Sequence, residues 1–139
     1  MRFRFCVTTL AMALLATTLS ARAGDKSDVS FVQLMVNMQY FTHKLGLAID
    51  AGNKPLAGFY VHEVEETLET LEDVEQYQGY PIGSIAKSKL AGPFERLEEA
   101  IKQDKDASGA YDELIDGCNK CHDATGREYL RIVRNPNNH

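Results

Sequence analysis

The five residues from Cys118 to His122 bring two thiols and one imidazole together in the pattern C-x-x-C-H. This is the spacing at which a c-type haem is attached to a protein chain. The two thiols add across the haem vinyl groups while the adjacent imidazole binds the iron. On a helix Cys118 and His122 share a face and Cys121 flanks it, so one helix can hold the haem edge and the iron together. We therefore predict one covalently bound haem c, with Cys118 and Cys121 as attachment residues and His122 as the proximal iron ligand.

Other chemistries fit these residues less well. A structural zinc site needs four ligands, and the motif supplies three with no second cluster elsewhere. A thioredoxin-like dithiol needs a strand before its helix, and the sequence shows no strand pattern. A carboxylate-bridged di-metal bundle needs inward-facing Glu-x-x-His motifs, whereas Glu63, Glu66 and Glu69 are typical of a solvated face. No nucleophile and base pair stands out, so we do not expect an enzyme.

The first residues are typical of a secretory signal. Arg2 and Arg4 precede an apolar run, and Ala21-Arg22-Ala23 has the A-x-A form of a cleavage site. The run is shorter than the roughly 20 apolar residues that span a bilayer. We predict that residues 1–23 are a cleaved signal peptide and that the mature form has no membrane anchor.

Export agrees with the motif, because covalent haem attachment takes place outside the bacterial cytoplasm, where a free C-x-x-C pair tends to oxidise. We predict a periplasmic protein whose residues 24–139 form one domain. Cys6 lies inside the signal and is lost with it. A lipoprotein signal is not expected, because the long apolar core follows Cys6 instead of preceding it.

The composition is acidic, with a net charge of −5 for the whole chain. This charge makes nucleic acid an unexpected partner. An acidic surface favours periplasmic redox partner proteins with a basic face, because electrostatic steering raises association rates. Solubility alone is an equally good explanation of the charge.

Apolar residues recur at steps of three and four along four segments, which is the period of amphipathic helices. We predict a first helix over residues 28–51, capped by Ser27. Gly52 and Asn53 end it, and a second helix begins near Pro55 and runs to about residue 78. Together these form an antiparallel hairpin.

The third and fourth helices complete the domain. The third starts near Ile85, and Gly92-Pro93 must kink it or split it in two. The last is capped by Ser108 and runs to about Val133. Its apolar face comprises Tyr111, Leu114, Ile115, Cys118, His122 and Tyr129. The fold class is therefore all-α, an up-down-up-down four-helix bundle with the haem motif inside its last helix.

A signal peptide, four helices and Cys118-Asn119-Lys120-Cys121-His122 in the last helix resemble the class II cytochromes c, which include cytochrome c-prime. The resemblance covers the mature chain, but only the motif is specific at the level of residues. Class I cytochromes carry the motif near the N-terminus and their methionine ligand downstream, which is the reverse of the order here. Class II resemblance is also compatible with a homodimer through the first helices.

The sixth iron position has several candidates. Counting helical rise from the loop end places Met38 at about the depth of His122, with Met35 one turn deeper. Class II resemblance implies that the first helix supplies the residue facing this position: an apolar side chain in five-coordinate members, a methionine in low-spin ones. Met38 fits that place, although methionines at this spacing are as often core filling. His43 and His62, at equal distances from the predicted turn, are the alternatives.

The chain departs from the class II pattern after the motif. A basic residue commonly follows the ligand histidine by four positions in that class, whereas Gly126 stands here and Arg127 follows. Arg127, Arg131 and Arg134 are candidates to pair with haem propionates or, more simply, to complement the carbonyl end of the helix.

Two functions remain open from the sequence. One haem in a small acidic protein predicts an electron carrier, for which a six-coordinate iron suffices. The alternative, implied by cytochrome c-prime, is a protein that binds or buffers small gases such as nitric oxide or carbon monoxide. That behaviour needs a five-coordinate iron behind apolar residues.

Overall fold

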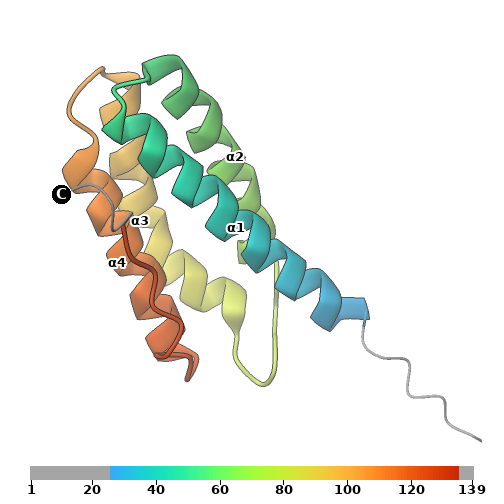
Figure 1. Cartoon of the computed structure of the whole chain (residues 1–139). Coiled ribbons are helices and arrows are strands. Elements are labelled where there is room, and N and C mark those ends of the chain that lie inside the picture. Colours follow the sequence, from blue (N-terminus) through green and yellow to red (C-terminus); the bar gives the residue numbers. More distant parts are fainter. Residues whose placement is uncertain (1–25, 135–139) are drawn as a thin grey trace, which may run out of the picture.

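Four helices make up the fold in the computed structural model, which describes residues 26–134. They are α1 (Lys26–Asp50), α2 (Lys54–Glu72), α3 (Ile82–Lys102) and α4 (Ser108–Ala124). Each helix runs antiparallel to the one before it (Figure 1). The described part of the chain contains no strand, only an isolated β-bridge between Tyr77 and Tyr80. The prediction of an all-helical four-helix bundle is confirmed, while the predicted signal peptide lies outside the described residues.

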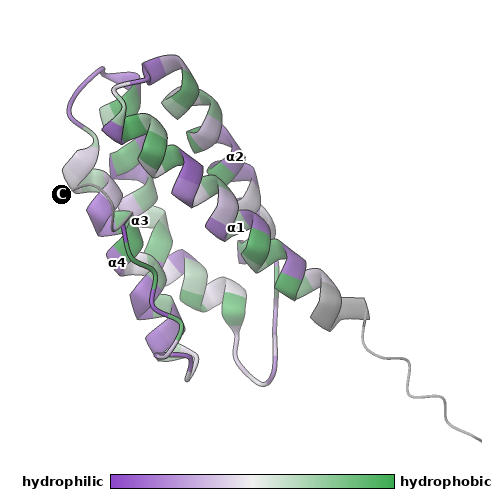
Figure 2. Cartoon of the chain, in the orientation of Figure 1, coloured by the Kyte–Doolittle hydropathy of each residue, from purple (hydrophilic) through white to green (hydrophobic). Residues whose placement is uncertain are grey.

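The four helices do not pack equally closely. α1 packs mainly on α2 and α3 mainly on α4, whereas α1 and α4 touch over a much shorter stretch. Hydrophobic and hydrophilic residues alternate along each helix (Figure 2), as expected for helices that bury one face. The largest fully buried side chains are Leu45, Val64 and Leu97. No helix among the described residues is long and apolar enough to cross a lipid bilayer.

The turn between α1 and α2 agrees with the prediction. Gly52 adopts a positive φ of 63°, which favours glycine, and ends α1. The Asn53 side chain accepts a hydrogen bond of 3.2 Å from the Leu56 amide, and Pro55 lies in the first turn of α2. The predicted cap Ser27 is wrong, because α1 already includes that residue.

The second helix is shorter than predicted. α2 ends at Glu72, and the residues that follow form a loop in which Tyr77 and Tyr80 exchange two main-chain hydrogen bonds of 3.0 Å. The Gly83 amide donates to the Val74 carbonyl at 2.8 Å, which fastens the loop to the start of α3. Val74 and Tyr77 pack on the core from this loop. Their apolar spacing therefore reflected loop packing and not another helical turn.

The third helix is continuous, so of the two alternatives predicted at Gly92-Pro93, a kink or a split, the split is wrong. Pro93 lies inside α3 and cannot donate a main-chain hydrogen bond to the Lys89 carbonyl, one turn earlier. Tertiary packing holds the helix together, since Leu90, Phe94 and Leu97 on either side of the proline are all buried.

The start of α4 also differs in detail. Ser108 is the first residue of the helix and not its cap. Ala107 occupies the N-cap position, and Oδ1 of the preceding Asp106 accepts a hydrogen bond of 2.9 Å from the Ser108 amide.

Candidate functional site

The haem-attachment motif occupies the C-terminal half of α4. Cys121 is buried and Cys118 and His122 are half-buried, and all three line a cavity of about 590 Å³ between α4 and α1. That volume lies in the range of pockets that hold cofactors. The lining is largely apolar. It includes four apolar residues that are exposed to solvent in this structure: Val32, Val36, Leu130 and Val133. Apolar walls of this kind fit a flat hydrophobic ligand such as a haem.

The fourth helix ends earlier than predicted, just after the motif. Gly126 has a φ of 67°; its amide donates to the Asp123 carbonyl, and the Arg127 amide donates to the His122 carbonyl at 2.9 Å. These two bonds form a Schellman motif, which ends a helix at a glycine. The predicted helix to Val133 is therefore wrong. The Gly126 in the sequence was the signal that could have revealed it.

The residues after this glycine return along α4 as an irregular segment, 127–134, which we name the C-terminal strap (Figure 1). Asn119 fixes its middle: the amide donates to the Ile132 carbonyl at 3.0 Å and accepts from the Ile132 amide at 2.8 Å. Arg134 fixes its end by pairing with Asp112 at 2.8 Å and with Asp50. The strap thereby forms one wall of the cavity.

The strap also contacts the imidazole of the motif. The His122 Nδ1–H donates a hydrogen bond of 2.6 Å to the Leu130 carbonyl. This bond fixes the ring orientation and leaves Nε2 as the nitrogen that can bind a metal. A histidine that binds haem iron has this arrangement, because a second partner on the other nitrogen raises its basicity.

Burial controls the chemistry of the two thiols, both of which are free. Burial raises the pKa of Cys118 to about 12, and it also raises the pKa of Cys121. Both are therefore uncharged at neutral pH, and a dithiol redox centre, which requires a reactive thiolate, is disfavoured. Among the described residues, no group of three or more His, Cys, Asp or Glu is arranged to hold a metal ion. A haem needs fewer protein ligands, since its porphyrin nitrogens surround the iron.

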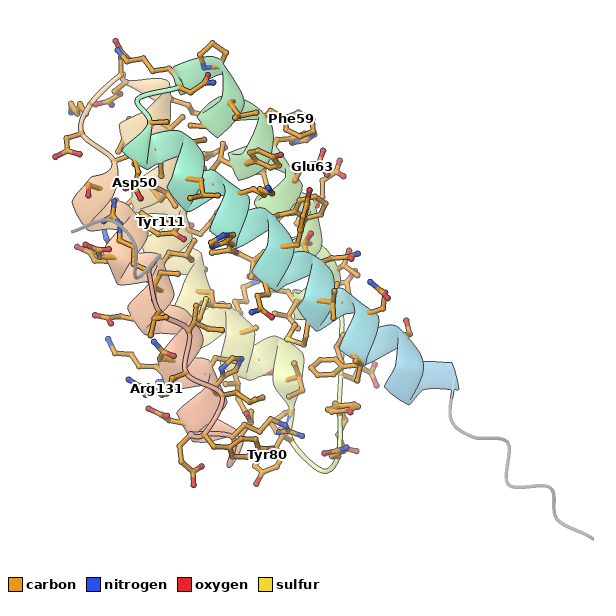
Figure 3. All side chains as sticks on the ribbon, viewed as in Figure 1. Asp50, Phe59, Glu63, Tyr80, Tyr111 and Arg131 are labelled. Atoms are coloured by element: carbon orange, nitrogen blue, oxygen red, sulfur yellow. The ribbon has the colours of Figure 1, made fainter. Side chains whose placement is uncertain are left out.

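A hydrogen bond sets the register of α1 against α4. The buried Tyr111 hydroxyl donates to the Thr42 carbonyl at 3.0 Å, at the end of the bundle where Figure 3 labels Tyr111 and Asp50. Met35 lies seven residues before Thr42, and Cys118 lies seven residues after Tyr111. Because the helices are antiparallel, Met35 and Cys118 stand at about the same level.

This register bears on the sixth-position candidates. Side chains on a helix point back toward its N-terminus. By this register Met38 lies about one turn from that level toward Tyr111, and His122 lies about one turn from it in the opposite direction. The main chains of Met38 and His122 are therefore not at equal depth, contrary to the count from the sequence, and only the direction of the side chains brings them nearer. Met38 is 9% exposed, lines the cavity and accepts a weak hydrogen bond at its Sδ from the Thr42 hydroxyl, 3.8 Å away. The structure thus brings Met38 to the cavity that His122 also lines.

The two histidine candidates for the sixth position lie in different places. His43 is exposed and lines the cavity, nearer the Tyr111 end. His62 lies on the exposed face of α2, with its ring nitrogens 3.6 Å from a Glu65 oxygen and 3.4 Å from a Glu66 oxygen. The structure therefore brings Met35, Met38 and His43 to the cavity but not His62.

The three arginines of the strap have different surroundings. Arg127 donates to the Thr125 carbonyl at 2.8 Å, at the C-terminal end of α4, and lies over the Tyr77 and Tyr80 rings. Arg131, labelled near the same end in Figure 3, pairs with Asp123 at 3.4 Å. Arg127 and Arg131 both line the cavity, whereas Arg134 lies near the opposite end of α4. Arg134 therefore complements neither the carbonyl end of α4 nor a propionate in this cavity.

Comparison of the chain with protein-family models, with curated proteins and with solved structures gives no significant match in any of the three. The site itself is therefore the basis for the proposed function.

Proposed function

We propose that this chain is a periplasmic monohaem c-type cytochrome that carries single electrons. The observation that carries the proposal is the 2.6 Å bond from His122 Nδ1 to the Leu130 carbonyl, beside two free cysteines on the wall of a largely apolar cavity. A bound haem supplies a one-electron iron couple. The remaining chemistry comes from the residues of this chain.

Each part of the cavity has a role in this proposal. Cys118 and Cys121 would hold the haem through thioether bonds, and His122 would bind the iron through Nε2. Arg127 and Arg131 would bind the propionates, because guanidinium groups at the rim of the cavity match carboxylates. The apolar side chains of α1 would exclude water from the haem face, which favours a stable redox couple.

The net charge of the chain supports a redox partner with a basic docking face. The whole chain carries a charge of −5, and α2 holds many of its carboxylates on exposed or half-exposed positions: Glu63, Glu65, Glu66, Glu69 and Glu72. Complementary charge raises the rate at which two carriers meet more than it raises their affinity.

The binding of small gases is the second candidate. Its support is the apolar side of the cavity on α1, which Phe31, Met35 and Val36 line. It requires that no side chain stay bound in the sixth position. Met38 as a firm ligand would favour electron transfer, and Met38 as a neighbour would favour gas binding.

The test is to express the chain with its export signal in a host that attaches haem to C-x-x-C-H motifs. We expect a mass increase equal to one haem that survives denaturation, and sharp α and β bands in the ferrous spectrum. The control is the double variant Cys118→Ala/Cys121→Ala, which should lose the covalent haem. Absence of a Soret band in the wild-type protein would exclude the cytochrome assignment. Bands that broaden or shift with carbon monoxide would favour gas binding.

A further inference from the structure

The carbonyl that accepts the His122 hydrogen bond belongs to an irregular segment. Leu130 lies in the C-terminal strap, where no helix or sheet fixes the direction of its carbonyl. On the N-terminal side, the Leu130 amide donates to the Arg127 carbonyl at 2.8 Å. The orientation of the imidazole therefore depends on what holds the strap after Leu130.

Asn119 is the nearest buried attachment on that side. Asn119 is one of the two middle residues of the C-x-x-C-H motif and is 6% exposed. Its side-chain amide donates one hydrogen bond to the main chain of Ile132 and accepts another from it. Two such hydrogen bonds to the main chain of one residue resemble the pairing between neighbouring strands of a β-sheet. They fix both the position and the orientation of that residue. Ile132 is two residues from Leu130, so little freedom remains between them.

The other attachments of the strap are weaker or more distant. Arg131 pairs with Asp123 at 3.4 Å, but both side chains are about half exposed, at 58% and 49%. An exposed ion pair of this kind contributes about 0–1 kcal/mol. Arg134 is held more firmly, yet it lies four residues beyond Leu130. Asn119 is thus the attachment that fixes the Leu130 carbonyl.

We propose that Asn119 is a positioning residue for the iron site: through Ile132 it holds the Leu130 carbonyl against His122 Nδ1. The inference rests on the proposed haem function. A hydrogen bond at Nδ1 raises the basicity of the imidazole and so favours the ferric over the ferrous state. Loss of the Asn119 bonds lets the strap move, weakens that hydrogen bond and raises the midpoint potential.

The experiment compares Asn119→Leu, which keeps the branched shape but removes both hydrogen bonds, with Lys120→Leu, a matched change at the exposed middle position of the motif. Three quantities are measured on the haem-loaded proteins: hydrogen exchange of the Ile132 amide, the iron–imidazole stretching band in the Raman spectrum, and the midpoint potential. For Asn119→Leu we expect faster hydrogen exchange of the Ile132 amide, a lower frequency of the iron–imidazole stretching band and a higher midpoint potential. A tenfold change in the ferrous to ferric ratio corresponds to about 59 mV for one electron. Lys120→Leu should match the wild type in all three quantities.

Two outcomes overturn the inference in different ways. If the wild type attaches no haem, the proposed function fails and the inference fails with it. If Asn119→Leu attaches haem but keeps the wild-type potential and Raman band, only the inference fails. Should Asn119→Leu not fold, Asn119→Ala decides in its place, because alanine suits a helix and also removes both bonds. An unchanged potential in that variant overturns the inference equally.

Discussion

Gly117 of α4 lies directly against the main-chain carbonyl of Lys89 in α3. A Cβ atom at Gly117 would come within 2.7 Å of the Lys89 oxygen. This is the carbonyl that Pro93 leaves without its helical donor, because proline has no N–H. A proline in α3 and a glycine in α4 therefore meet at one point. Cys118 follows Gly117, so this contact sets how closely the motif approaches α3.

Replacing Gly117 by alanine should destabilise the protein. The new methyl group must push α4 away from a main-chain atom that cannot move aside, and overpacking of this kind costs about 1–3 kcal/mol. Urea denaturation followed by circular dichroism measures the change. Gly109→Ala is the matched control, because a Cβ there meets no atom within 4 Å. That variant should be neutral or more stable, and an equal loss in both variants would contradict the packing explanation.

The Tyr111 hydroxyl predicts a pH dependence of stability. Burial raises the pKa of Tyr111 from its ordinary value of 10.0 to about 12. The folded state therefore keeps this proton when the unfolded chain loses it. The contribution of this proton to the free energy of unfolding should be fully present below pH 10.0 and should be lost as the pH rises through about 12.

Tyr111→Phe tests this dependence, because it removes the hydroxyl and the hydrogen bond to Thr42. Near neutral pH the variant should be less stable by about 1 kcal/mol. The difference between variant and wild type should shrink or reverse in alkaline buffer. A difference that stays constant across that range would show that the Tyr111 hydroxyl does not titrate with a raised pKa.

The identity of the sixth ligand can be decided by two alanine variants. Met38 and His43 both line the cavity, and His43 lies nearer the Tyr111 end. We expect Met38→Ala to replace a low-spin ferrous spectrum by a five-coordinate one and to allow carbon monoxide to bind. His43→Ala should leave the spectrum unchanged. The opposite pattern would assign the position to His43, and no change in either variant would remove both from it.

The pairing of Arg134 should contribute to stability, because it joins three segments. Its guanidinium pairs with Asp50 at the end of α1 and with Asp112 at the start of α4, and its side chain is 27% exposed. Arg134→Gln should lower the stability by about 1 kcal/mol, with a smaller loss at high salt. Lys54→Gln removes a pair with Asp104 in which both side chains are about two-thirds exposed, at 68% and 65%, and should have little effect. Thermal melts of both variants at low and high salt measure the difference.

Much of the architecture was predictable from the residues. Apolar residues at steps of three and four mark all four helices, and Gly52, Asn53 and Pro55 mark the first turn, because capping and stop signals act over a few residues. Gly126 marks the end of α4 by the same local rule. The motif from Cys118 to His122 is equally local, since one helix alone sets the spacing of its thiols and imidazole.

The tertiary structure decided the rest. That α3 runs unbroken through Pro93 depends on the side chains buried around it, and the end of α2 depends on how the following loop packs. The contact of His122 with Leu130 and the role of Asn119 exist only because the C-terminal strap folds back along α4. The separation of His43 from His62 likewise depends on how α1 and α2 turn within the bundle. A sequence sets the conformation of neighbouring residues directly, whereas contacts between distant residues follow from how whole elements fill space together.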